Sequence, residues 1–224
     1  MTRGLFIKKA MESKQNKMKS QIINYALHFL WPVSCPVCGA PAEIICDDCI
    51  KSLFAEKIIS RNLEGRLEVK SPSWYHTRIN KIISAFKYSG ARELCRPVGR
   101  IMGEFLERPE ADYLLPVPLH LKSERKYNQA RELAKGLSDS WRLEIFDGAE
   151  WSKVVPNRAG LAEAERMKLT PEAFKISNEI NGLRVALVDD VCTTGMTLLR
   201  LAQACEACGA EVTGAYTLTT VSGD

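Results

Sequence analysis

The sequence predicts an α/β fold in which a parallel sheet is flanked by helices. The apolar run at residues 184–188 is typical of a buried strand, and residues 198–208 follow it with helical spacing. Residues 212–218 form a second strand candidate. Strand, helix and strand in this order predict a parallel sheet, because parallel neighbours need a crossover connection. Residues 113–117 followed by 128–138 repeat the strand-to-helix order earlier in the chain.

Helical spacing also marks the segments before this alternation. Apolar residues recur at helical intervals over residues 79–86, and residues 94–106 predict a second helix. A short amphipathic helix is expected at residues 22–30. The polar segment 156–171 predicts a long loop that is either mobile or functional, and a strand is expected to start just before it at residues 154–155.

The chain length of 224 residues suits one α/β core with a small additional module. No run of 18 apolar residues is present, so neither a membrane helix nor a signal peptide is predicted. We therefore expect a cytoplasmic protein that makes no contact with a membrane. In that reducing compartment the eight cysteines are expected to be metal ligands or buried thiols rather than disulfides.

Positive charge is concentrated at the amino terminus. Residues 1–30 carry six lysine and arginine residues against one glutamate, a net charge of +5 (6 − 1), while the whole chain carries +4. The remainder is close to neutral at −1 (4 − 5). Such a leader either contacts a polyanion or is a solvated tail, and charge alone does not make the chain a nucleic-acid-binding protein.

These features divide the chain into three parts. Residues 1–30 form a basic leader with a short helix, residues 31–60 a cysteine-rich module, and residues 72–224 the α/β domain. The boundary before the α/β domain is expected around Pro72, because a proline between two serines interrupts regular structure.

The cysteine-rich module contains two C-x-x-C pairs. The four cysteines are Cys35, Cys38, Cys46 and Cys49. Each pair can present two thiolates from a tight turn, and two such turns complete a tetrahedral Cys₄ site for a structural zinc ion, which is favoured over disulfides. Cys205 and Cys208 form a third pair, but they fall inside a predicted helix, where small buried side chains are favoured over a metal site.

The strongest functional signal is the segment 185–197, which reads VALVDDVCTTGMT. A buried strand delivers Asp189 and Asp190 to its carboxyl end, where open α/β sheets bind ligands. The following turn enters a helix, so its backbone N–H groups and hydroxyls converge at the positive end of the helix dipole. This predicts a socket for a phosphate monoester, with the acids facing a diol; a plain strand end followed by a helix cap is the alternative. The residues expected to hold the phosphate are Thr193, Thr194, Gly195 and Thr197.

This segment resembles the phosphoribosyl pyrophosphate signature of type I phosphoribosyltransferases. Further segments resemble the ComF family, in which a zinc module precedes such a domain; they are residues 85–90, 115–119, 125–130, 160–161 and 165–166. Lys126 stands where the family usually has glycine. The resemblance implies a type I phosphoribosyltransferase fold with a small N-terminal Cys₄ zinc-finger module.

The resemblance also implies roles for individual residues. Asp189 and Asp190 would hold the ribose hydroxyls and act with Arg125 in catalysis. Arg125 suits this role because a guanidinium can fork onto two phosphate oxygens. The residues implied on the pyrophosphate side are Leu119, Arg125, Lys126, Asn128 and Arg166. Mg²⁺ would accompany phosphoribosyl pyrophosphate.

Three functions stay open at this point. The first is a phosphoribosyltransferase of unknown acceptor, in which a nitrogen nucleophile displaces Mg²⁺-bound pyrophosphate from C1 of the ribose. The second is a phosphoribosyl-ligand sensor or partner-recruiting protein that transfers nothing. ComF-like proteins are associated with DNA uptake in natural transformation, so protein partners of that process are expected. The third is direct nucleic-acid binding by the zinc module and leader, which predicts a steep salt dependence.

Overall fold

The computed structural model describes residues 35, 37–40, 45–88, 92–121, 123–152 and 169–222. The helix predicted at residues 22–30, the strand predicted to start at 154–155 and most of the loop predicted at 156–171 lie outside these residues. The chain divides into two compact units, residues 1–49 and residues 50–224.

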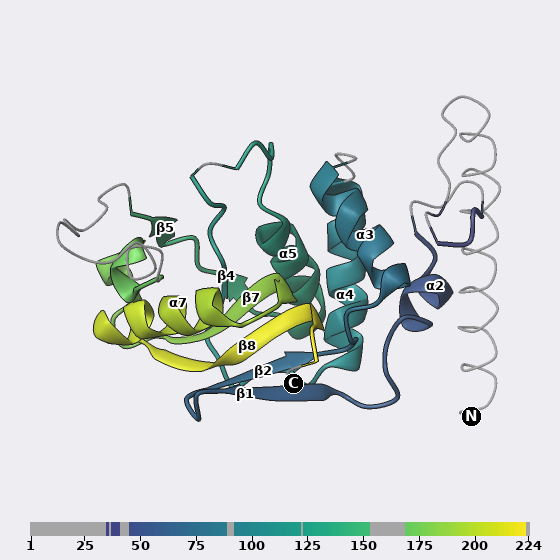
Figure 1. Ribbon diagram of the computed structural model, residues 1–224. Coiled ribbons are helices and arrows are strands. Elements are labelled where there is room, and N and C mark those ends of the chain that lie inside the picture. The colour runs from purple at the N-terminus through teal and green to yellow at the C-terminus, as the bar shows by residue number, and fades with distance from the viewer. Residues whose placement is uncertain are drawn as a thin grey trace, which may run out of the picture. The chain divides into compact units, whose positions relative to one another are not determined.

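A six-stranded sheet forms the centre of the larger unit, in the order β1-β2-β8-β7-β3-β4 (Figure 1). Five strands run parallel: β2 (Leu67–Ser71), β8 (Glu211–Thr220), β7 (Arg184–Cys192), β3 (Tyr113–Pro116) and β4 (Glu144–Ile145). β1 (Ile59–Leu63) is antiparallel to β2. The parallel sheet is confirmed, whereas β1 and β2 were not predicted and precede the expected start of the α/β domain at residue 72.

The helices described in this unit flank the sheet. They are α3 (Thr77–Tyr88), α4 (Cys95–Phe105), α5 (Gln129–Trp141) and α7 (Met196–Ala207), with 3-10 turns at Arg92–Leu94, Pro171–Ala173 and Asn178–Ile180. A separate antiparallel pair joins β5 (Ala149–Trp151) to β6 (Phe174–Ile176), and the short helix α2 (Asp47–Lys51) spans the boundary between the two units. The predicted helices that fall in the described residues are thus confirmed to within three residues at each end.

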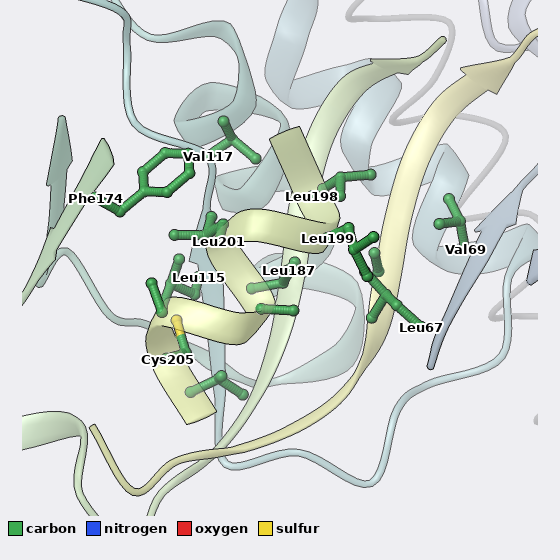
Figure 2. Packing of buried hydrophobic residues seen from close by; sticks show 14 of the residues in the cluster. Leu67, Val69, Leu115, Val117, Phe174, Leu187, Leu198, Leu199, Leu201 and Cys205 are labelled. Carbon is green, nitrogen blue, oxygen red and sulfur yellow. The ribbon is translucent and has the colours of Figure 1, made fainter. Parts of the chain in front are cut away.

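The hydrophobic core lies where α7 packs on the sheet (Figure 2). Leu198, Leu201 and Cys205 of α7 lie close to Leu187 of β7 and Leu115 of β3, and each of the five is at most 1% exposed. The central strands are covered on both faces, which explains why the sequence of β7 begins as an unbroken apolar run rather than an alternating one.

The two strand-to-helix crossovers run in opposite directions across the sheet. From β3 the chain passes through α5 to β4, which lies on one side of the adjacent pair β7 and β3. From β7 it passes through α7 to β8, which lies on the other side of that pair. Because such crossovers are right-handed, α5 and α7 cover opposite faces of the sheet. The segments that follow β3 and β7 therefore diverge, and a crevice opens between the carboxyl ends of these two strands.

Helices α4 and α5 pack with their backbones in contact. A Cβ atom added at Gly136 of α5 would lie 2.1 Å from the Arg96 carbonyl oxygen and 2.5 Å from the Arg100 amide nitrogen. One added at Gly99 of α4 would lie 2.2 Å from the Leu133 carbonyl oxygen. Backbone atoms inside helices cannot yield as a flexible side chain does, so both positions require glycine.

We expect Gly136→Ala to lower the free energy of unfolding by about 2–3 kcal/mol, because the two helices have to separate to admit the methyl group. Urea unfolding measures this change. Ser138→Ala, at a half-buried position of the same helix, is the matched control and is expected to change the free energy by less than about 0.5 kcal/mol. Equal effects of the two substitutions would contradict the close packing.

Candidate functional site

Asp190 lies at the crevice, near the carboxyl end of β7. It is 8% exposed, and its Oδ2 atom accepts no hydrogen bond among the described residues. The Lys87 ammonium of α3 is 3.2 Å from Oδ2, an ion pair without the geometry of a hydrogen bond. A buried carboxylate oxygen without a donor is costly, so this atom is available to a ligand hydroxyl, a water or a cation.

Asp189 is partly buried beside Asp190. Its Oδ1 accepts a 2.8 Å hydrogen bond from the Asp190 amide. Burial, followed by the negative charge of Asp190, raises the pKa of Asp189 well above its ordinary value, and the Asp190 amide and the Lys87 charge oppose this shift in part. The pair therefore favours a ligand that brings hydroxyl donors or positive charge.

β7 runs four residues further than the predicted segment 184–188. It stays paired with β8 as far as Cys192, with Thr217 opposite Asp189 and Thr220 opposite Cys192. β-branched threonines suit an extended strand, so β8 holds the polar end of β7 in the ladder. Both acids consequently sit on a rigid strand rather than on a loop.

Gly195 makes the turn from β7 into α7. It is the N-cap of the helix with φ 80° and ψ 0°, a left-handed conformation that favours glycine. A Cβ atom here would also lie 2.4 Å from Leu63 Cδ1 of β1. The backbone conformation therefore favours glycine, and a larger residue would also have to displace the Leu63 side chain. The close approach of a phosphate that the sequence predicted is a further, separate reason for glycine.

The turn presents hydrogen-bond donors at the amino end of α7. Within the described part of the chain, the backbone N–H groups of Thr193, Thr194 and Gly195 donate no hydrogen bond, while the Met196 N–H donates to Thr194 Oγ1 at 3.4 Å. The positive end of the helix dipole adds to these donors. Together they have the character of an anion socket.

Arg61 of β1 contacts this turn from the hairpin. Its Nη1 donates to the Thr193 carbonyl oxygen at 2.8 Å and to Thr220 Oγ1 at 2.9 Å, and the Cys192 carbonyl oxygen lies at 3.4 Å. The hairpin that was not predicted thus contributes directly to the site.

The loop after β3 is held by the side chain of Asn128. Its Oδ1 accepts from the Arg131 N–H at 3.3 Å as the N-cap of α5, and its Nδ2 donates to the Val117 carbonyl oxygen at 2.9 Å. The Arg125 guanidinium donates to Gln129 Oε1 at 3.1 Å. Asn128 therefore has a structural role that is independent of its predicted contact with pyrophosphate.

The carboxyl end of α3 is tied to the same loop. The Tyr127 hydroxyl donates to the Phe86 carbonyl oxygen, and Gln129 Nε2 donates to the same oxygen at 3.4 Å. Lys87, the next residue, contacts Asp190. The fold thereby brings together three segments that carried the family resemblance, around residues 86, 127 and 190.

Two adjoining cavities open at the crevice. The smaller has a volume of about 240 Å³ and the larger about 550 Å³, and they share Pro118, Leu119, Asn128 and Trp151. Trp151 is fixed between them, because its Nε1 donates to the Pro118 carbonyl oxygen at 2.7 Å and its ring centroid lies 4.7 Å from that of His120.

The predicted site residues separate into three groups. Those that line the smaller cavity are Leu119, Arg125, Asn128, Asp189, Asp190 and Thr197. Thr193, Thr194 and Gly195 form the adjacent turn. Lys126 is exposed, and Arg166 lies outside the described residues.

Three residues at the site were not predicted from the sequence, namely Lys87, Trp151 and Arg61. Lys87 falls inside a segment that resembles the family, which was the available signal. Trp151 is a lone aromatic just before the predicted polar loop, a weaker signal. Arg61 gave no signal in the sequence, because nothing local shows that its side chain reaches the turn after β7.

Four cysteines cluster in the smaller unit: Cys35, Cys38, Cys46 and Cys49. Their sulfur atoms all lie within 4.8 Å of one another. In the first turn the Gly39 N–H donates to the Cys35 carbonyl oxygen at 2.8 Å, and the Ala40 N–H donates to Cys38 Sγ at 3.4 Å. Thiolates about 2.3 Å from a tetrahedral ion are separated by roughly 3.8 Å, so the cluster fits a metal ion.

Cys205, from the third pair, lies on α7 and is fully buried in the core, which confirms its predicted packing role. Cys208 is partly buried at the end of this helix. Among the described residues, no helix has both the length and the apolar character needed to cross a membrane.

Known competence proteins share sequence with this chain along most of its length. Competence protein F from Haemophilus influenzae is 32% identical over 172 residues, which cover 66% of this chain and 73% of that protein. The chain belongs to the competence protein F (ComF) family. The ComF-family protein ComFC from Bacillus subtilis is 24% identical over 207 residues, covering 88% of this chain and 79% of that protein. No protein-family model matches the chain.

This ComF-family chain has a largely parallel sheet flanked by helices, with a cysteine cluster before it in the sequence. The resemblance predicted from the sequence is therefore confirmed. Among solved structures, adenine phosphoribosyltransferase from Thermoanaerobacter pseudethanolicus is similar over 77% of this chain and 86% of that chain, at 19% identity and a TM-score of 0.40.

We expect Asp189→Asn to stabilise the ligand-free protein at high pH. Because the pKa of Asp189 is raised by folding, the folded state binds its proton more tightly than the unfolded state does. Wild-type stability therefore falls as pH rises from the ordinary aspartate pKa of about 4 towards the raised value. Asparagine does not titrate, so the variant should be more stable than wild type by about 1–2 kcal/mol near pH 8 and by much less near pH 4.

Urea unfolding at the two pH values checks this difference. Asp112→Asn is the control of opposite sign, because the hydrogen bond from Arg184 lowers the pKa of Asp112. Its carboxylate contributes stability above the ordinary pKa, and that contribution is lost as pH falls. A gap between Asp189→Asn and wild type that does not change with pH would contradict the raised pKa.

Proposed function

We propose that this ComF-family protein binds phosphoribosyl pyrophosphate with Mg²⁺ in the crevice between β3 and β7. The observation that carries the proposal is the buried Asp190 Oδ2, which lacks a hydrogen-bond donor beside a turn of unpaired amides. A ligand with hydroxyls next to a phosphate monoester complements both features at once. Ribose 5-phosphate has this arrangement.

The acids and the turn bind different ends of the ligand. The carboxyl oxygens of Asp189 and Asp190 accept hydrogen bonds from the ribose hydroxyls. The turn binds the 5-phosphate through its N–H groups and through the hydroxyls of its threonines. The residues assigned to the 5-phosphate are Thr193, Thr194, Gly195 and Thr197.

The pyrophosphate side faces the loop after β3. Arg125 is the cation of the smaller cavity on this side, and a guanidinium neutralises phosphate oxygens in pairs. The residues assigned to pyrophosphate are Leu119, Arg125, Lys126, Asn128 and Arg166. The carboxylates of Asp189 and Asp190 fit Mg²⁺ through its bound water, because Mg²⁺ prefers oxygen ligands and retains several waters. When bound, Mg²⁺ neutralises charge on the departing pyrophosphate.

We further propose that the protein is a phosphoribosyltransferase. The bond from C1 of the ribose to the pyrophosphate oxygen breaks, the electron pair leaves with pyrophosphate, and a nitrogen of the acceptor forms the new bond to C1. The chain needs no covalent nucleophile for this step. Its residues position the ribose, Arg125 offsets the charge that develops on the leaving group, and the carboxylates stabilise positive charge at C1.

The names of two relatives refer to competence. We propose that the protein acts in DNA uptake, in the cytoplasm and with protein partners of that process. A sensor that binds the ligand without transferring it is the second candidate. Two relatives of this chain from Salmonella are called DNA utilization proteins, a name that is compatible with a transferase and with a sensor.

We propose zinc as the ion of the cysteine cluster. Four thiolates that lie within 4.8 Å of one another suit Zn²⁺ and leave no open position for a substrate, so the ion has a structural role.

Cys46→Ser is expected to reduce bound zinc from about one ion per chain to near zero, because three thiolates hold Zn²⁺ far less tightly than four. Mass spectrometry of the desalted protein measures the metal. Cys208→Ser, at a partly buried cysteine outside the cluster, should keep full occupancy. Zinc retained by Cys46→Ser, or wild type purified without zinc, would refute the assignment.

Asp190→Asn is expected to weaken the binding of Mg²⁺ and phosphoribosyl pyrophosphate by about 10- to 100-fold, the range for losing a charged hydrogen-bond partner. The isosteric amide keeps the shape of the crevice. Isothermal titration calorimetry measures the affinity. Asp112→Asn is the matched control, since Asp112 pairs with Arg184 at the amino end of β7. Equal affinities of wild type and Asp190→Asn would exclude this crevice as the binding site.

Pyrophosphate release separates the two candidate functions. Wild type is incubated with Mg²⁺, phosphoribosyl pyrophosphate and a panel of nitrogen acceptors. Release that depends on an acceptor and is lost in Asp190→Asn supports the transferase. Binding without release for any acceptor supports the sensor.

A further inference from the structure

Arg61 reaches the phosphate turn from a strand that lies far away in the sequence. Its side chain is partly buried, and Nη1 carries two hydrogens. The two short contacts account for both of them, one to the Thr193 carbonyl oxygen at 2.8 Å and one to Thr220 Oγ1 at 2.9 Å. The guanidinium therefore bridges the start of the turn and the end of β8.

The contact with Thr193 fixes the direction of the next amide. A trans peptide is planar, so the carbonyl of Thr193 and the N–H of Thr194 point in opposite directions. Because Arg61 holds the Thr193 carbonyl on the hairpin side, the Thr194 N–H is directed away from the hairpin. That N–H is one of the unpaired donors of the turn.

The peptide between Thr193 and Thr194 depends on Arg61 more than its neighbour does. Among the described residues, Arg61 provides the one hydrogen bond to the Thr193 carbonyl. The preceding carbonyl, of Cys192, also accepts from the Val221 N–H at 3.0 Å and from the Thr220 hydroxyl at 3.3 Å. Loss of Arg61 would leave the Cys192 carbonyl held but free the Thr193 carbonyl to rotate.

Arg61 also supplies charge that the turn lacks. Residues 185–199 contain two aspartates and no lysine or arginine. Lys87 pairs with Asp190, so its charge is directed at the acids rather than at the turn. The Arg61 charge lies against the backbone of Thr193, where it raises the potential felt by a phosphate dianion.

We propose that Arg61 is the positioning residue of the 5-phosphate subsite. It sets the Thr193–Thr194 peptide so that the Thr194 N–H faces the ligand, and it offsets the negative charge of the two acids. This inference rests on the proposed phosphoribosyl function and adds the residue that makes the site selective for a phosphorylated ribose. It also gives the β1–β2 hairpin a function in ligand binding.

The test uses the full-length zinc-loaded chain and two probes, ribose 5-phosphate and Mg²⁺-pyrophosphate. Arg61→Ala is expected to bind ribose 5-phosphate about 10- to 100-fold more weakly than wild type, as for loss of a hydrogen bond to a charged group. Its affinity for Mg²⁺-pyrophosphate should stay within about twofold, because that probe contacts the loop after β3. Added ethylguanidinium should restore binding of ribose 5-phosphate to Arg61→Ala, because it returns the missing guanidinium with its charge and its donors.

Arg66→Ala is the matched control. Arg66 lies in the same hairpin, and its side chain is 59% exposed at 3.8 Å from Glu206. It should bind both probes as wild type does. Equal loss of both probes in Arg61→Ala, without rescue, would reduce Arg61 to a general structural role and overturn the inference. Unchanged binding of ribose 5-phosphate would overturn it as well.

A ligand-free measurement separates this inference from the proposed function. The residual dipolar coupling of the Thr194 N–H reports the direction of that bond in wild type and in Arg61→Ala. If wild type binds neither probe, the proposed function fails and so does the subsite that depends on it. If wild type binds ribose 5-phosphate but the Thr194 coupling is the same in both proteins, the proposed function stands and the positioning role is refuted.

Discussion

The opposite directions in which the chain leaves β3 and β7 determine where this protein can bind a ligand. The two strands are adjacent and parallel, so their carboxyl ends meet at one edge of the sheet. Right-handed crossovers then send α5 and α7 to opposite faces, and the segments between strand and helix cannot fill the space that opens. Asp190, near the carboxyl end of β7, and Arg125, on the segment after β3, face the same small cavity for this reason.

The polar groups at this edge are less well paired than those elsewhere in the described structure. Asp190 Oδ2 is its one buried side-chain polar atom without a hydrogen bond, and the raised pKa of Asp189 means that folding disfavours its charged form. Both features lower stability in the absence of a ligand. Rigid elements hold these groups in place, namely the β7–β8 ladder beneath the acids and Arg61 beside the turn. Stability lost at the site is the expected consequence of keeping donors and acceptors free for a ligand.

Local sequence predicted the parts of the site that depend on local chemistry. A buried strand, two acids and a Gly-containing turn before a helix specify their own geometry, so the turn from β7 into α7 and the cysteine cluster were foreseeable. The β1–β2 hairpin was not, because its strands are short and polar and it joins the sheet through the pairing of β2 with β8, nearly 150 residues later in the chain. Arg61 and Leu63 act on the turn only through that pairing. Lys87 is an intermediate case. Its segment carried the resemblance to the family, but only the three-dimensional structure shows that Lys87 pairs with Asp190.

The loop after β3 shows that a motif alone does not fix the role of each of its residues. Lys126 occupies the position where the family usually has glycine, yet its φ is not positive, so this backbone does not need glycine there. Asn128 uses both ends of its amide to cap α5 and to hold the Val117 carbonyl. A residue that fixes its loop in this way is required whether or not it contacts a ligand. On this side of the cavity, positive charge therefore comes mainly from Arg125, whose guanidinium donates a hydrogen bond to Gln129. On the β7 side, the backbone itself provides the hydrogen-bond donors.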